Sequence, residues 1–99
     1  MIRQPPLIAA RGLIDAGDQL LTADAPLAAL HESCGGTIPG TVAVPELLEL
    51  VQQTREMGLR LAREFSAFDG EDNVTAFARI RPLSEEEGGG CEVLSLIHI

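Results

Sequence analysis

The sequence predicts a single α+β domain, in which a five-stranded antiparallel sheet carries helices over one face. The 99 residues are enough for one ordinary domain, and 45% of them are apolar, which is enough for a core. Several alternating segments flank one strongly amphipathic helical segment. Over residues 8–99 we expect the order strand–strand–helix–helix–strand–strand–strand, after a flexible lead-in at residues 1–7.

The first two strands are predicted to form a hairpin. Residues 7–15 (LIAARGLID) are an apolar run, typical of a strand buried on both faces. Residues 16–18 have turn chemistry, because Gly tolerates positive φ and Asp can bond its own backbone. Residues 19–23 then return as the second strand.

Two helices are expected next. Asp24 is predicted to cap the first, since its carboxylate can accept free N–H groups of the first turn. Residues 37–44 show little periodicity. Pro45 opens the second and stronger helix, which we expect to end at Gly58, although LRLARE could extend it. Its apolar stripe holds Leu47, Leu50, Val51, Thr54 and Gly58.

Three strands are predicted to complete the sheet as an antiparallel meander. Residues 59–68 and 74–83 alternate, and a polar hairpin loop separates them. On the second of these strands, Phe77 faces the same way as Arg79 and Arg81. A flexible acidic turn at residues 84–90 then leads into a final strand at residues 91–99. The long helix is the main available cover for their apolar face.

The final strand is expected to be apolar on both faces. One face would hold Cys91, Val93, Ile97 and Ile99. The other would hold Leu94 and Leu96, with Phe77 beside them. An exposed apolar patch marks an interface, so these three residues predict a homodimer contact or a partner helix. Alternatively, residues 1–6 or a flanking segment cover the patch.

The order of elements resembles that of the PAS domain, a sensor and interaction module of bacterial signalling proteins. The matching stretches are GLIDAGDQLLTADAPLAAL, the helix from Pro45 through Gly58 into a strand, and the FDG hairpin followed by RIRPL and a final apolar strand. The resemblance spans residues 8–99. It implies a five-stranded sheet in the order 2-1-5-4-3, frequent dimerisation, and a place in a two-component system, within a longer signalling chain such as a histidine kinase.

The cofactor is left unknown. Cys34 lies in Glu-Ser-Cys-Gly-Gly, unlike the Asn-Cys-Arg-Phe run of the flavin-binding members, and residues 45–58 lack the histidine of the haem-binding members. A small-molecule ligand between the long helix and the sheet would contact apolar residues such as Leu50, Val51 and Met57. A ligand-free dimerisation module remains the alternative.

Charge and hydropathy restrict the partners. The net charge of −8 argues against nucleic acid and against anionic membrane surfaces. No apolar run approaches the ~20 residues that span a bilayer, and no export signal is recognised, so we expect a cytoplasmic protein.

No self-sufficient catalytic signature is present, and we expect a regulatory domain rather than an enzyme. The side chains weighed for acid–base, metal or thiol chemistry are Asp15, Asp18, His31, Cys34, Asp69, Cys91 and His98. The simpler roles are turns for the aspartates, a bond to nearby carbonyls for His31, a buried or loop position for Cys34 and core filling for Cys91. His98 stands on the last strand and could reach the sheet surface, and no third metal ligand is spaced with either histidine. Two alternatives stay open, namely a small acid–base enzyme with one buried carboxylate and partner binding by strand addition at a sheet edge.

Overall fold

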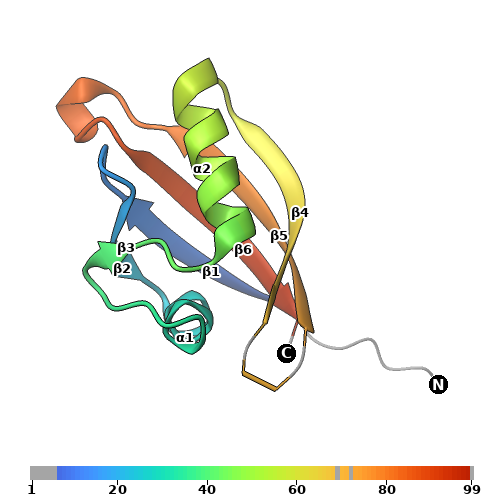
Figure 1. The fold of residues 1–99 in the computed structure, drawn as a ribbon. Helices are drawn as coiled ribbons and strands as arrows, with labels where there is room; N and C mark the ends of the chain where they lie inside the picture. The colour runs from blue at the N-terminus through green and yellow to red at the C-terminus, as the bar shows by residue number, and fades with distance from the viewer. Residues whose placement is uncertain (1–6, 69, 72, 99) are drawn as a thin grey trace.

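The computed structural model describes residues 7–68, 70–71 and 73–98, and Figure 1 shows its fold. The elements in chain order are β1 (Leu7–Ile14), β2 (Gln19–Ala23), α1 (Ala25–Ser33), β3 (Gly40–Thr41), α2 (Pro45–Met57), β4 (Leu61–Phe68), β5 (Asn73–Pro82), the 3-10 turn η1 (Glu85–Glu87) and β6 (Cys91–His98). The predicted lead-in lies outside the described residues, apart from Leu7, which begins β1.

The structure is α+β, and its antiparallel sheet has the strand order β3-β2-β1-β6-β5-β4. The predicted count of five strands is therefore wrong for the described residues, which form six. The strand that the sequence did not reveal is β3, whose two residues pair with Gln19 and Leu20 of β2. Two residues are too few to show any periodicity. The predicted meander of β4, β5 and β6 is confirmed.

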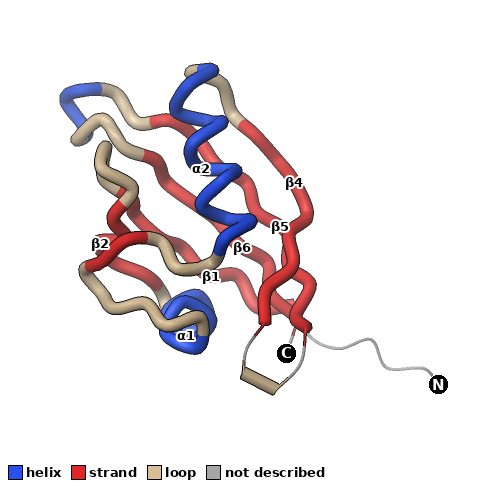
Figure 2. The backbone as a smooth tube through the Cα atoms, in the orientation of Figure 1, coloured by secondary structure: helices blue, strands red, loops and turns tan. Residues whose placement is uncertain are grey.

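Both helices lie on the same face of the sheet (Figures 1 and 2), and the core fills the space between the two layers. Helix α2 buries Leu47, Val51 and Thr54, as its apolar stripe predicts. It ends at Gly58, which has a left-handed φ of 65° and donates its N–H to Thr54 O at 2.9 Å. The predicted end of this helix is confirmed.

Strand β1 is buried on one face only, which corrects the prediction of burial on both faces. Ala10, Gly12 and Ile14 are buried against the helices, whereas Ala9 and Arg11 are exposed. The prediction failed because the outward positions of this run are filled by small or partly apolar residues, while the helices of the described residues cover only one side of the sheet.

Asp24 stands at the N-cap position of α1, but its carboxylate makes no capping hydrogen bond. Its Oδ2 instead accepts the N–H of Arg11 in β1 at 2.9 Å. A donor from a distant strand has thus displaced the local donors that the sequence favoured. The acidic turn after β5 also differs from expectation, because Ser84 and Glu87 form a reciprocal capping box around η1.

Candidate functional site

The outer face of the sheet, which turns away from both helices, has β6 along its middle, between β1 and β5. Leu94 and Leu96 are half-buried and point outward, because their strand neighbours are buried against the helices. Leu96 pairs with Phe77 of β5 on one side and with Ala9 of β1 on the other. We call Ala9, Phe77, Leu94 and Leu96 the outer patch. Phe77, the aromatic residue of the four, is 38% exposed.

Two arginines bracket Leu94 within the sheet. Arg79 of β5 and Arg11 of β1 both pair with this residue, from opposite sides, and both are exposed. Arg60, just before β4, lies with Arg79 and Leu94 around a depression of about 260 Å³. Within the part of the chain that the structure describes, none of these three arginines is ion-paired with a carboxylate.

A fourth arginine at this face, Arg81, is already neutralised. Its Nε donates to Glu92 Oε1 at 3.0 Å, and its Nη2 lies 3.6 Å from Glu87 Oε2. The hydrogen bond from Arg81 is the main reason that the pKa of Glu92 lies below its usual range. Unpaired positive charge on the outer face therefore gathers beside Leu94 and not at the Arg81 end.

Sequence reasoning identified Phe77, Leu94 and Leu96 as interface candidates, and the structure brings them together. Sequence reasoning did not identify Arg11, Arg60 and Arg79 as part of the same surface. Strand alternation already placed Arg79 on the face of Phe77. No comparable signal existed for Arg11, because its position beside Leu94 depends on the pairing of the first strand with the last.

The aspartates weighed as general bases have structural roles where the structure describes them. Asp15 Oδ1 accepts the N–H groups of Gly17 at 2.8 Å and of Gln19 at 3.0 Å, which closes the β1–β2 turn. Asp18 accepts hydrogen bonds from Arg55 and Gln52 of α2. Asp69 lies outside the described residues.

The protonation of Asp18 follows from this contact. Burial acts to raise its pKa, but the hydrogen bonds from Arg55 and Gln52, together with the Arg55 charge, outweigh burial and leave the pKa lowered. A general base in a desolvated active site needs a raised pKa instead. Asp18 is therefore an ion-pair partner that ties the first hairpin to α2.

His31 holds the loop between the helices. Its side chain is 1% exposed; Nε2 lies 2.7 Å from Thr37 O, and Nδ1 accepts the N–H of Ala43 at 3.2 Å. Both bonds together require the neutral ring with its proton on Nε2. This matches the satisfied, buried role weighed for His31. The side chain of His98 lies outside the described part of the structure.

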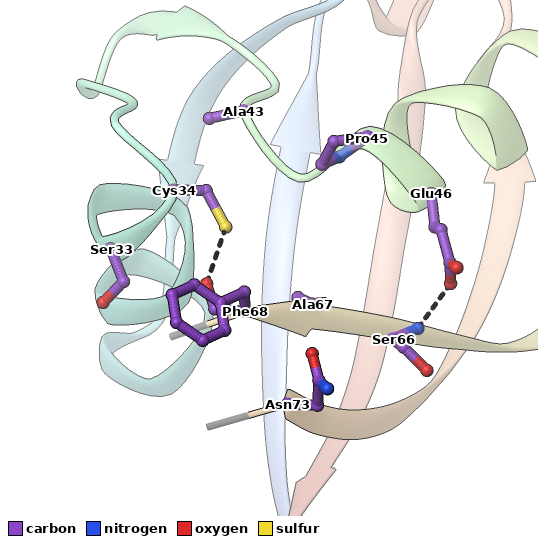
Figure 3. Close-up of a pocket in the computed structure, with 9 residues that line it drawn as sticks. All are labelled: Ser33, Cys34, Ala43, Pro45, Glu46, Ser66, Ala67, Phe68 and Asn73. Atoms are coloured by element: carbon purple, nitrogen blue, oxygen red, sulfur yellow. Dashed lines mark hydrogen bonds between the residues drawn. The ribbon is translucent and has the colours of Figure 1, made fainter. Parts of the chain in front are cut away.

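A second depression, of about 570 Å³, opens between the end of α1, the start of α2 and the end of β4. Figure 3 shows that the Cys34 thiol points to Phe68 and donates to its carbonyl oxygen at 3.3 Å. In the same view, Glu46 accepts the N–H of Ser66 at 2.5 Å. These two side chains form hydrogen bonds with backbone groups on the free edge of β4, so these groups are not available to pair with another strand.

The three apolar residues predicted to line a ligand pocket lie in different surroundings. Val51 is fully buried against the sheet, Leu50 is half-buried, and Met57 is 51% exposed. None of them lines either depression described above. The thiol of Cys91 donates to the carbonyl oxygen of Val51 at 3.9 Å, and burial raises the pKa of this thiol.

No family model and no curated protein matches this chain. Among the described residues, no three His, Cys, Asp or Glu side chains are grouped so as to hold a metal ion. No helix in the described ranges is both long and apolar enough to cross a membrane.

Proposed function

We propose that this chain is a PAS-like regulatory domain of a cytoplasmic bacterial signal-transduction protein such as a histidine kinase. It acts by packing the outer face of its sheet against a dimer mate or an adjoining signalling helix. The observation that carries the proposal is the outer patch: β6, a central strand, presents Leu94 and Leu96 on the face that α1 and α2 do not cover. A helix or sheet face must bury its apolar side against another element.

The strand order supports the PAS-like assignment. When the two-residue β3 is set aside, the five longer strands lie in the order second, first, fifth, fourth, third. This is the order that the family resemblance implies, and both helices lie over one face as that resemblance also implies. In such a domain, a signal acts by favouring one packing of the sheet face over another.

The ligand-free form of this mechanism is the better supported one. Val51, one of the residues expected to line the ligand pocket, is already fully buried by protein atoms. The acid–base enzyme has less support, because two carboxyl groups have shifted pKa values among the described residues, Asp18 and Glu92, and arginine partners lower the pKa of both.

The proposal is tested by the association and dye binding of the purified chain. We expect sedimentation velocity and native mass spectrometry to show either a dimer or a monomer that binds a hydrophobic dye. Leu94→Asp should abolish whichever of the two is observed, whereas the control Leu59→Asp, at a 64% exposed residue outside the sheet, should change neither. A monomer without dye binding, unaffected by Leu94→Asp, would overturn the proposal.

A further inference from the structure

The shape of the outer patch and the charge of the arginines beside it favour one kind of binding partner. Arg11 and Arg79 flank Leu94 on neighbouring strands. Strands are spaced about 4.8 Å apart, so the two arginine backbones stand about 10 Å apart across β6. An α-helix with its side chains has a diameter of about 10–12 Å. A helix lying along β6 would therefore rest on Leu94 and Leu96 with one guanidinium on each flank.

Charge decides what kind of helix fits. Among the described residues, Arg11, Arg60 and Arg79 form no ion pair with a carboxylate. Arg60 and Arg79 share the depression beside Leu94 with Glu92, which is hydrogen-bonded to Arg81 and whose pKa the Arg11 charge also helps to lower. Carboxylates on the flanks of a docked helix would pair with these side chains. Lysine or arginine at the same places would meet three positive charges.

A second copy of this sheet face fits less well. In a two-fold symmetric contact, each patch meets the same patch of its partner. The outer face and its rim carry four arginines against three glutamates, Glu64, Glu87 and Glu92. Two of these glutamates, Glu87 and Glu92, already pair with Arg81. Face-to-face pairing would therefore oppose like charges.

The overall charge of −8 does not prevent the docking of an acidic helix. Glu46, Glu49 and Glu56 belong to α2, on the opposite face of the sheet. Packed layers lie roughly 10 Å apart, so these carboxylates are farther from a docked helix than the arginines beside Leu94, which it would contact. Because Coulomb energy falls with distance, those arginines have the stronger effect on the docked helix.

We propose that the outer patch binds an acidic amphipathic helix, which lies along β6 with apolar residues on Leu94 and Leu96 and with carboxylates paired to Arg11 on one flank and Arg79 on the other. This inference rests on the proposed function and names the partner of the same surface. The eight residues of β6 extend over about 26 Å, which corresponds to a helix of about 18 residues.

The test uses three helical peptides of about 18 residues that share one leucine stripe and differ only in their flanking residues, Glu, Gln or Lys. Binding to the whole chain is measured by fluorescence anisotropy at two salt concentrations. We expect the Glu peptide to bind most tightly and the Lys peptide most weakly. The advantage of the Glu peptide should shrink as salt rises.

Chain variants identify the contacts. Arg79→Gln and Arg11→Gln should each weaken the binding of the Glu peptide about two- to fivefold, as expected for exposed ion pairs. Neither variant should change the affinity for the Gln peptide. Arg63→Gln is the matched control, because Arg63 pairs with the inward-facing Ala78 and bonds to the neighbouring Ala62 carbonyl. It should have no effect.

The possible failures are distinguishable. Equal binding of all three peptides, with no effect of the arginine variants, would overturn the acidic helix and keep the outer patch as an interface. A sheet-to-sheet dimer that the Glu peptide does not dissociate would do the same and identify the second copy as the occupant. No binding of any peptide, together with no effect of Leu94→Asp on association or dye binding, would overturn the proposed function as well.

Discussion

Replacing Ser95 by alanine should stabilise this protein, contrary to the usual effect of a core substitution. Ser95 is 0% exposed in the middle of β6, and its hydroxyl has no hydrogen-bond partner among the described residues. Its neighbours across the sheet are Ala10 and Ala78, whose methyl groups offer no acceptor. Alanine at this position would continue a row of methyl groups.

The magnitude follows from two opposing terms. A buried polar group without a partner costs about 1–3 kcal/mol, which the substitution removes. The hydroxyl oxygen also makes a few dispersion contacts of about 0.1–0.2 kcal/mol each, which the substitution loses. The difference is a gain of about 1 kcal/mol. For a domain of this size, that raises the melting temperature by about 4–8 °C.

Urea unfolding followed by circular dichroism measures this difference. We expect the midpoint of Ser95→Ala to rise with an unchanged m-value, because the surface exposed on unfolding stays the same. Ser66→Ala, at an exposed position of β4, is the control and should stay within about 0.5 kcal/mol of the parent chain. A loss of stability in Ser95→Ala would mean that the hydroxyl is hydrogen-bonded, and would refute the reasoning.

Three further predictions concern the contacts that hold the fold. The lowered pKa of Asp18 means that its pairing with Arg55 stabilises the fold above about pH 4, the unfolded value, and that this contribution disappears as the pH falls through the lower folded value. The Asp18→Asn variant should therefore lose less stability below pH 4 than the parent chain. An identical loss of stability in acid would contradict this. His31→Ala should cost about 2 kcal/mol or more in urea unfolding, because two buried backbone groups lose their partner, and a cost below about 0.5 kcal/mol would show that those bonds are replaced. Gly90→Ala should abolish soluble folded protein, because the added methyl group would overlap the β1 backbone. Gly17→Ala has room for a methyl group and should fold and melt like the parent chain. Equal behaviour of the two variants would refute this packing.

Much of the secondary structure could be predicted, because periodicity is a local property of the chain. The stripe of α2 and its end at Gly58 follow from helical spacing and from the tolerance of glycine for positive φ. The alternation of β5 likewise places Phe77 and Arg79 on the same face of the sheet. Strand β3 could not be predicted in this way, since two residues carry no period and its pairing with β2 is a long-range contact.

The candidate site was predictable only in part. The composition of β6 alone indicates that Leu94 and Leu96 need cover, because both of its faces are apolar. The flanking arginines belong to other strands, and whether they reach Leu94 depends on strand order and register. For the same reason, the sequence favours Asp24 as a local helix cap, while the structure gives its carboxylate to a backbone N–H of β1.

The sequence by itself determined which residues share a face along each long element, because backbone geometry repeats every 2 residues in a strand and every 3.6 in a helix. Only the tertiary structure decided which outward residues become neighbours. Pairing the first strand with the last places Arg11 beside Leu94, and the position of α1 and α2 on one face leaves the other face of β6 without a helix among the described residues. These choices depend on how the whole chain buries its apolar surface, which no local segment encodes.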